Sequence, residues 1–283
     1  MTSWVLFPRL HLAEVEDQTW CPSWLREHSH LALARMWRTS NSKNGSPATQ
    51  ACDILLRSLG GPAKASQFTF IDACAGAGGP TPLLESTMNK KLAAHGFKPV
   101  DFVLTDLWPD ISAWEKIVKK SEHITYVKDP IDATKPQRLA KPGSKECRIF
   151  NLCFHHFKDD GAKKVLASAI QSTDAFMIFE MTHRTIPSLL NTTIVILSVF
   201  ITTLYDYYWS PFHILLTYLI PIVPIFYAID GYVSCTRGRT ACETWDLLYS
   251  QPDVDLSEWE LSSGEQTALL PFGRLYWYAG VRK

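Results

Sequence analysis

The chain has 283 residues, which is long enough for one large domain or two small ones. Its formal net charge is zero and its lysines and arginines do not cluster, so nothing predicts a nucleic-acid-binding surface. The seven cysteines are scattered without C-x-x-C spacing, which predicts reduced thiols in a cytosolic setting and no metal site. The first residues turn acidic early, so we expect no secretory signal.

The first 61 residues are predicted to form a helical cap. Apolar side chains recur at helical spacing between Trp20 and Trp37. A polar break follows over residues 39–47, and residues 51–59 then predict a second helix that ends at Gly60 and Gly61.

Residues 68–85, with the sequence FTFIDACAGAGGPTPLLE, predict a strand, a glycine-rich turn and a helix. The apolar run ends at Asp72, a loop of small residues follows, and Pro80 and Pro82 lie where a helix would begin. Such a unit binds nucleotide-like ligands, because glycines let the backbone approach the ligand and the start of the helix offers free N–H groups.

Three glycines in this turn, Gly76, Gly78 and Gly79, lie too close together for the G-x-G-x-x-G pattern of dinucleotide-binding proteins. A phosphate-binding loop with Gly-Lys-Ser/Thr is absent from the sequence. An NAD-dependent reductase is therefore disfavoured.

Helices and strands alternate after the turn. The predicted helices span residues 82–94, 110–120 and 159–172, and the predicted strands span 100–105, 124–127, 147–154 and 175–181. Ser112 and Glu115 are placed as a capping box for the second of these helices. Strands separated by helices predict a parallel sheet covered by helices on both faces.

Residues 185–230 form a hydrophobic insert. Two uncharged stretches flank Asp206, and each approaches the roughly 20 residues that cross a bilayer. Tyrosines and Trp209 gather at the break, and arginines flank only the outer ends, which predicts a helical hairpin with both ends in the cytosol. Pro211 can begin the second helix, whereas Pro221 and Pro224 should bend it. Three arrangements remain open: two full spans, a shallow monotopic hairpin, and a soluble hairpin buried in a homodimer.

The C-terminal part returns to a soluble pattern. Thr240 and Glu243 predict a capping box for a helix that ends near Tyr249. Strands are predicted over residues 257–263 and 275–281, and the connection between them is short enough only for a hairpin. This predicts an antiparallel strand pair.

The segment Asp72-x-Cys74-x-Gly76-x-Gly78 resembles the first motif of class I S-adenosylmethionine (SAM)-dependent methyltransferases, Asp/Glu-x-Gly-x-Gly-x-Gly, with Cys74 in place of the first glycine. The resemblance extends over the ends of four successive predicted strands. It implies that the N-terminal helices either form a lid over the substrate or cover one end of the sheet. It also implies a SAM site formed by Asp72, Cys74, Ala75, Gly76, Gly78, Asp106, Leu107, Asp132, Ala133, Asn151 and Phe154.

Within this set, Asp106 ends the second strand, where a carboxylate can accept both ribose hydroxyls. The resemblance implies that Asp132, followed by Ala133, meets the adenine amino group, with Asp129 as a rival. It places the segment from Asn151 to Phe154 beside the methionine half of the cofactor.

His155 and His156 are the candidates for proton transfer, because histidine titrates near neutral pH. On an extended chain adjacent side chains point to opposite sides, so at most one of them should face the site. Glu180 and His183 form a second candidate pair at the end of the next strand.

The expected fold is a Rossmann-like, seven-stranded, mostly parallel α/β sheet with an antiparallel C-terminal strand, N-terminal helices and a hydrophobic helical hairpin insert. The expected domains are a cap (1–61), a SAM-binding core (62–184), a membrane hairpin (185–230) and a C-terminal part that completes the core (231–283). The resemblance implies a SAM-dependent methyltransferase, and the hydrophobic hairpin predicts that it is membrane-associated, faces the cytosol and acts on a small apolar or lipid-like acceptor. The alternative is a non-catalytic SAM-fold protein that scaffolds membrane partners.

Overall fold

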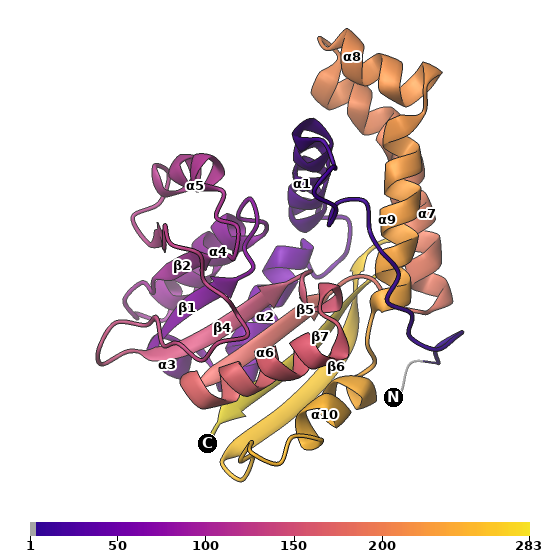
Figure 1. Ribbon diagram of the computed structural model, residues 1–283. Coiled ribbons are helices and arrows are strands. Elements are labelled where there is room, and N and C mark those ends of the chain that lie inside the picture. Colours follow the sequence, from indigo (N-terminus) through magenta and orange to yellow (C-terminus); the bar gives the residue numbers. More distant parts are fainter. Residues whose placement is uncertain (1–3) are drawn as a thin grey trace.

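A seven-stranded sheet with the order β3-β2-β1-β4-β5-β7-β6 forms the centre of this computed structural model, which describes residues 4–283 (Figure 1). Five strands are parallel: β1 (Phe68–Ala73), β2 (Phe102–Thr105), β3 (Ile124–Tyr126), β4 (Lys145–Asn151) and β5 (Ala175–Glu180). β7 (Gly273–Arg282) pairs antiparallel with both β5 and β6 (Trp259–Leu269). The predicted fold class is confirmed.

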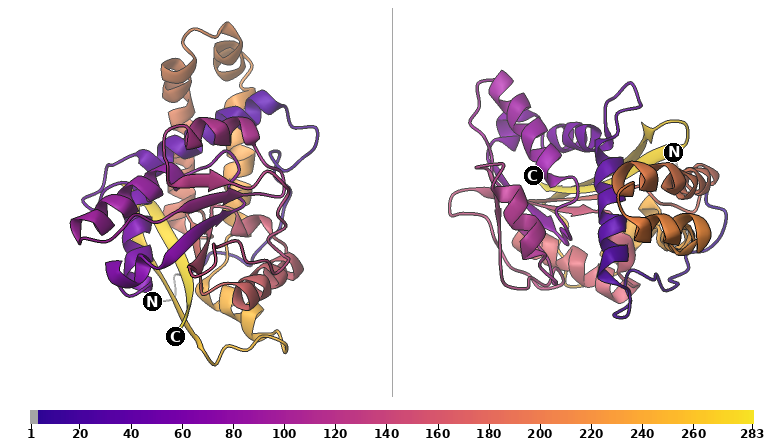
Figure 2. Two further views of the ribbon diagram at one scale, coloured as in Figure 1. Left: turned by 90° about the vertical axis from the view of Figure 1, so that its left-hand side faces the viewer. Right: turned by 90° about the horizontal axis from the view of Figure 1, so that it is seen from above.

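Helices cover both faces of the sheet, which explains why β1 and β5 are buried along their whole length and carry no polar alternation (Figure 2). One face packs against α2 (Pro47–Ser58), α4 (Thr81–Ala94) and Trp114 of α5 (Ile111–Val118). The other face packs against α6 (Asp159–Ser172) and α10 (Ala241–Tyr249). The short helix α3 (Pro62–Ala65) precedes β1.

Capping residues close in the sequence determine where α10 and α5 begin. The predicted capping box of α10 is confirmed, because the Thr240 side chain accepts from the backbone N–H of Glu243 while the Glu243 carboxylate accepts from that of Thr240. The box predicted at Ser112 and Glu115 is wrong. Asp110 caps α5 instead, and its carboxylate accepts from the backbone N–H of Ala113 at 3.0 Å.

Two segments differ most from the predicted strands. β4 ends at Asn151, and Phe154–His156 form a 3₁₀ helix, η1, where a strand was expected. The expected loop over residues 264–273 is mostly strand, since β6 continues to Leu269 and β7 begins at Gly273. Residues 264–267 of β6 pair with residues 274–277 of β7. The long antiparallel partner therefore outweighs the weak strand propensity of this segment.

The hydrophobic insert forms two arms that project beyond the sheet (Figures 1 and 2). The first arm is α7 (Ile186–Tyr207); the second contains α8 (Pro211–Ile214), a π-helical turn η2 (Leu215–Leu219) and α9 (Ile222–Arg237). As predicted, Pro211 begins the second arm and the arm bends near Pro221, by 67°. Within residues 4–283, α7 is the one helix that is long and apolar enough to cross a membrane, and the bent second arm qualifies only as a broken span.

The N-terminal part separates into two units. α1 (Ser23–Arg38) lies against the hairpin, whereas α2 packs on the sheet. The segment that precedes α1 runs along the base of the hairpin, where the backbone N–H of Leu6 donates to the carbonyl of Arg184 and that of Leu10 donates to the carbonyl of Thr236. We call residues 4–22 the N-terminal strap. The strap and α1 thus connect the hairpin to the carboxyl end of the sheet.

Candidate functional site

The strand order reverses at β1, which has β2 on one side and β4 on the other. Ligands of open α/β sheets bind outside the carboxyl ends of the strands at such a switch point. A cavity of about 450 Å³ lies there, and we call it the switch-point pocket. Its wall combines the glycine-rich loop, the end of β4 and one side of α1: Asp72, Cys74, Ala75, Gly76, Ala77, Gly79, Asn151, Leu152, His156, Leu33, Trp37 and Arg38.

The loop after β1 keeps the backbone shape of a glycine motif even at the position of the cysteine. Cys74 has a φ of 62°, a left-handed conformation that is rare for residues other than glycine. Gly79 has a φ of 39°, and a Cβ added there would meet no atom within 4 Å. Backbone at this part of the pocket wall is therefore open to close approach by a ligand.

Gly78, a predicted cofactor residue, lies beside α5. A Cβ on Gly78 would lie 2.3 Å from Cδ1 of Ile117, and Gly78 is not part of the pocket wall. This glycine allows α5 to pack against the loop. A side chain at Gly78 would displace Ile117, which itself lines the switch-point pocket.

Asp72 and Asn151 form a polar pair in the wall of the switch-point pocket. The amide nitrogen of Asn151 donates to Oδ1 of Asp72 at 3.0 Å, and the Thr81 hydroxyl donates to Oδ2. Burial raises the pKa of Asp72 to about 7. Oδ1 of Asn151 is buried and has no hydrogen-bond partner among the described residues. The pair thus offers acceptor oxygens to a donor group of a ligand.

The other predicted cofactor residues lie outside the wall of this pocket. The Asp106 carboxylate accepts from the backbone N–H groups of Gly76 and Trp108, both at 2.9 Å, and Leu107 is exposed to solvent. Asp132 accepts from Thr134 and, with Ala133, lines a separate cavity of about 10 Å³. Phe154 is buried in η1 beneath the guanidinium of Arg239. The structure therefore brings together Asp72, Cys74, Ala75, Gly76 and Asn151.

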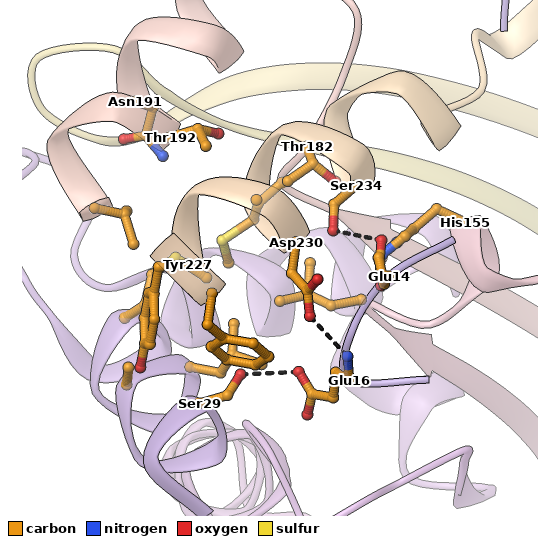
Figure 3. Close-up of a pocket in the computed structure, with 18 of the residues that line it drawn as sticks. Glu14, Glu16, Ser29, His155, Thr182, Asn191, Thr192, Tyr227, Asp230 and Ser234 are labelled. Atoms are coloured by element: carbon orange, nitrogen blue, oxygen red, sulfur yellow. Dashed lines mark hydrogen bonds and ion pairs between the residues drawn. The ribbon is translucent and has the colours of Figure 1, made fainter. Parts of the chain in front are cut away.

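A second cavity, of about 160 Å³, lies between the sheet and the hairpin, and we call it the hairpin pocket (Figure 3). The helices α1, α7 and α9 contribute most of its lining residues, which include the apolar side chains of Ala32, Met36, Val195 and Phe226 and the polar side chains of Asn191 and Asp230. Polar groups enter from the strap and η1, among them Glu14 and His155. The pocket thus combines apolar side chains with polar groups that could orient a ligand.

The two pockets share part of their walls: Glu16, Leu33, Leu152 and His156 line both. Leu152 has a φ of 53°, which is unfavourable for a bulky side chain. Its backbone N–H donates to the carbonyl of Phe179 at 2.9 Å, which holds the turn in place. A strained residue therefore lies where the two cavities meet.

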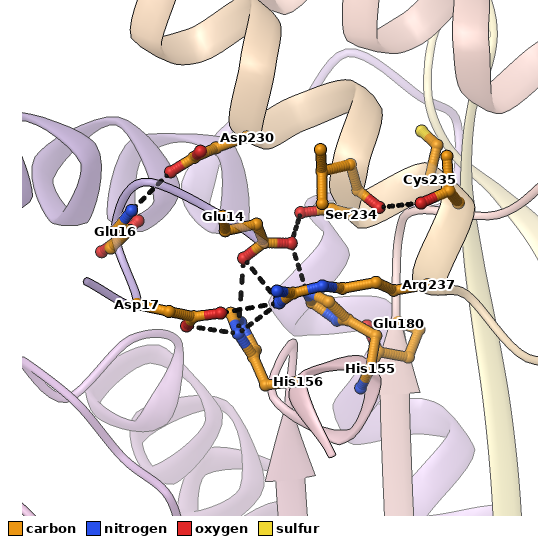
Figure 4. A network of polar contacts seen from close by, with 12 residues as sticks. Glu14, Glu16, Asp17, His155, His156, Glu180, Asp230, Ser234, Cys235 and Arg237 are labelled. Carbon is orange, nitrogen blue, oxygen red and sulfur yellow. Dashed lines mark hydrogen bonds and ion pairs between the residues drawn. The ribbon is translucent and has the colours of Figure 1, made fainter. Parts of the chain in front are cut away.

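His155 is held by Glu180 (Figure 4). Nδ1 of His155 lies 2.8 Å from one carboxylate oxygen of Glu180, and the backbone N–H of His155 donates to the other at 3.0 Å. The other ring nitrogen of His155, Nε2, lies at the wall of the hairpin pocket, 3.9 Å from the Glu14 carboxylate. Glu180 therefore pairs with His155, while His183 stacks on Tyr276 and lines neither of these two cavities.

His156 has a different environment. Its Nδ1 lies 3.0 Å from Asp17 and 3.4 Å from Glu14. Burial lowers the pKa of His156, but the hydrogen bond to Asp17 and the charge of Glu14 outweigh burial and raise the pKa to about 9. His156 is therefore charged at neutral pH and is a poor proton acceptor. His155 is the better candidate for a base.

The expectation that the two histidines point to opposite sides is wrong. It assumed an extended chain, but both residues belong to η1 and their ring centroids are 4.3 Å apart. A 3₁₀ turn does not alternate its side chains as a strand does. Both side chains therefore line the hairpin pocket.

Ligating atoms of Glu14, His155 and His156 lie within 4.8 Å of one another, as in a metal site. However, Nη1 of Arg237 lies 3.2 Å from Glu14 and 3.3 Å from Nδ1 of His156. This guanidinium already places a positive charge among the three groups and would repel a metal cation. The cluster is best described as an ion-pair network that joins the strap, η1 and α9 (Figure 4).

No motif in the sequence marks Glu14, Asp17 or Arg237 as site residues. Arg237 donates to Asp17 at 2.8 Å across 220 positions of the chain. Isolated charged residues so far apart carry no motif. Their meeting depends on the strap passing beside the base of α9.

No family model matches the chain, and no curated protein sequence matches it significantly. Similar solved structures include an O-methyltransferase family protein from Burkholderia thailandensis, with 15% identity and a TM-score of 0.48 over 91% of this chain and 59% of that one. Magnesium protoporphyrin IX methyltransferase from Synechocystis PCC 6803, solved with SAH, has 11% identity and a TM-score of 0.47 over 92% and 96% of the two chains. Human N-acetylserotonin methyltransferase, solved with SAM, has 10% identity and a TM-score of 0.46 over 91% and 55%. This chain thus spans less than two thirds of the Burkholderia and human proteins, and similarity at this level does not identify a reaction.

Proposed function

We propose that the protein is a membrane-associated, SAM-dependent methyltransferase that acts on a small apolar or lipid-like acceptor from the cytosolic side. One observation carries this proposal: the pocket at the switch point of the sheet meets a second pocket, between the sheet and the hairpin, at Leu152 and His156. A methyltransferase needs such an arrangement, because the methyl donor and the acceptor must be held side by side.

The switch-point pocket suits SAM in size and chemistry. Its volume of about 450 Å³ lies in the range of small-molecule sites. Asp72 and the unpartnered oxygen of Asn151 offer acceptors to an amino group, and the open backbone at Gly79 allows close approach. When bound, SAM supplies a methyl group attached to a positively charged sulfur, which is already a good leaving group.

The acceptor belongs in the hairpin pocket. For a hydroxyl acceptor, Nε2 of His155 would take the proton that the hydroxyl loses, and Glu180 would stabilise the resulting imidazolium through its 2.8 Å contact with Nδ1. The apolar wall would exclude water from the reacting groups. For a stronger nucleophile, such as an amine or a thiolate, positioning alone could supply much of the rate.

Calorimetric titration with SAM tests the cofactor site. Gly79→Val places a branched side chain on the wall of the switch-point pocket. Gly143→Val is the control, because Gly143 is also left-handed and would also have open space around an added Cβ, but it lies on an exposed loop outside the pocket. We expect SAM binding to be lost in the first variant and kept in the second. Equal binding by both would contradict the assignment.

Incubation of the purified protein with labelled SAM and a membrane extract tests the reaction. A labelled apolar product would support the proposed enzyme and identify its acceptor. SAM binding without any transfer, with extracts of several membranes, would instead favour the non-catalytic scaffold.

A further inference from the structure

The first arm of the hairpin has its polarity reversed relative to a helix of a soluble protein. Four of the five buried residues of α7 are polar: Ser188, Asn191, Thr192 and Thr203. Its most exposed side chains are apolar or aromatic and recur at helical spacing: Ile186, Leu190, Ile194, Leu197, Ile201, Leu204 and Tyr205. Water does not favour such an outer surface, so this face requires an apolar environment.

The second arm continues the same surface. In α9 the charged residues Asp230 and Arg237 are buried, while Ile222, Ile225 and Ile229 are exposed. Aromatic side chains that are amphipathic, among them Tyr208 and Trp209, are exposed at the turn between the arms. Tyrosine and tryptophan prefer the interface between a membrane and water. We call the exposed apolar residues of α7, α8, η2 and α9 the outer face.

The chain can cross a membrane only an even number of times within this insert. β5 precedes the insert and β7 follows it, and the two strands pair along their length in one sheet. Both ends of the insert therefore lie on the same side of any membrane. One crossing by α7 alone is excluded, which leaves two crossings or none.

The second arm is too short and too strongly bent for a straight second crossing. α9 has 16 residues, which span about 24 Å, whereas the apolar core of a bilayer is about 30 Å thick. The arm is bent by 67° at the break before α9, so α8 and η2 do not extend it in a straight line.

α1 also opposes two full crossings, because it is attached to the turn of the hairpin. Arg35 forms an ion pair with Asp206, and Trp24 packs edge-on against Phe212 with ring centroids 5.0 Å apart. Nδ1 of His28 lies 2.8 Å from the hydroxyl of Tyr227. A hairpin that crossed the bilayer would carry α1 with it, including its charged residues, and charges in the bilayer core are strongly unfavourable.

We infer that the hairpin is monotopic: its outer face lies in one leaflet of a lipid bilayer, while its inner face, α1 and the sheet remain on the cytosolic side. This inference rests on the proposed function and specifies how the enzyme meets its acceptor. The inner faces of α7 and α9 form a wall of the hairpin pocket. One layer of helix, about 10 Å thick, then separates the acceptor pocket from the lipid.

Flotation with phosphatidylcholine vesicles tests the lipid contact. The full chain should bind neutral vesicles and stay bound in high salt, because the outer face is apolar and carries no cluster of basic residues. Leu197→Glu combined with Ile201→Glu should weaken binding by roughly 100-fold, since each change removes at least a tenfold contribution. Tyr249→Glu changes an exposed aromatic residue on α10 and should bind as the wild type does.

Glycosylation in microsomes tests the number of crossings. A long hydrophilic Gly/Ser loop with one Asn-x-Thr acceptor is inserted between Trp209 and Ser210 of the full chain, and the same loop in a secreted protein serves as the positive control. A monotopic hairpin keeps the acceptor out of the lumen, so we expect no modification. Modification of the inserted loop would overturn the inference in favour of two crossings.

Two further outcomes separate this inference from the proposed function. If the wild type stays off vesicles and forms a dimer that the Leu197→Glu, Ile201→Glu variant dissociates, a second copy covers the outer face and the inference is wrong. SAM titration of the same preparation is independent of lipid. If the wild-type protein binds SAM but does not bind vesicles, only the monotopic hairpin is overturned. If it binds vesicles but does not bind SAM, only the cofactor assignment is overturned.

Discussion

SAM binding should strengthen as the pH rises from 6 to 7, and Asp72 should cause the change. Burial raises the pKa of this carboxyl to about 7, so most of it is protonated at pH 6. The amino group of SAM is positively charged below its own pKa, which for α-amino groups is about 7.7–8.0. Because the ionised carboxylate attracts this group and the neutral acid does not, raising the pH should increase affinity.

The magnitude follows from the fraction of Asp72 that is ionised. With a pKa of about 7 that fraction rises from roughly one tenth at pH 6 to one half at pH 7. If only the ionised form binds, the dissociation constant should fall about fivefold, which corresponds to about 1 kcal/mol. At pH 6, binding should also release close to one proton, because bound SAM keeps Asp72 ionised.

Calorimetry measures both quantities, with the released proton obtained from titrations in buffers of different ionisation enthalpy. Asp72→Asn should remove the pH dependence and weaken binding at pH 7. Asp101→Asn changes a carboxylate outside the switch-point pocket and should keep the wild-type profile. A dissociation constant that is flat between pH 6 and 7, or a pH dependence that persists in Asp72→Asn, would refute the reasoning.

Three other predictions concern turnover, stability and the hairpin. His155→Ala should lower turnover of a hydroxyl acceptor by about 10²–10⁴-fold, and Glu180→Gln should also lower it. Neither variant should change SAM affinity. Full turnover by both variants would exclude His155 as the base. Arg237→Leu should lower the unfolding free energy measured in urea by about 1.5–3 kcal/mol, because it removes one of the two cations beside the buried carboxylate of Glu14, at 3.2 Å, while His156 remains at 3.4 Å. An unchanged unfolding free energy would contradict this account. Replacement of residues 186–229 by a short Gly/Ser linker should keep the sheet and SAM binding but remove one wall of the hairpin pocket. Activity toward an apolar acceptor should therefore fall even in detergent, whereas activity toward a water-soluble analogue should fall less. Undiminished activity of the deleted protein toward the apolar acceptor would show that the hairpin pocket is not the acceptor site.

Several features of the fold could be predicted from the sequence because they depend on neighbours in the chain. The apolar run before Asp72 and the prolines after the loop define the strand–turn–helix unit within 18 residues. The capping box of α10 closes between Thr240 and Glu243, three residues apart. Alternation of strands and helices then limits the sheet to a parallel arrangement, since a parallel connection needs a crossover.

The ends of the elements were less predictable, because they depend on partners elsewhere in the chain. β6 extends through Gly264 and Glu265 because β7 supplies a paired strand there, and nothing local to the sequence GEQT indicates that partner. β4 stops at Asn151 because the chain turns into η1. That single change brings His155 and His156 to the same side, against the expectation for a strand.

By itself, the sequence determined the sheet, the glycine-rich loop and the existence of an apolar hairpin, since each is encoded in residues that are close together in the chain. Only the tertiary structure decided how the hairpin is oriented and which charged groups meet at its base. Glu14 and Arg237 lie 223 positions apart, and their contact exists because the strap passes beside α9 after the sheet has brought both ends of the insert together. The periodicity of a helix shows which residues share a face. The face that is buried depends on the elements that pack against the helix, and for α7 these elements are α1, α9 and β7.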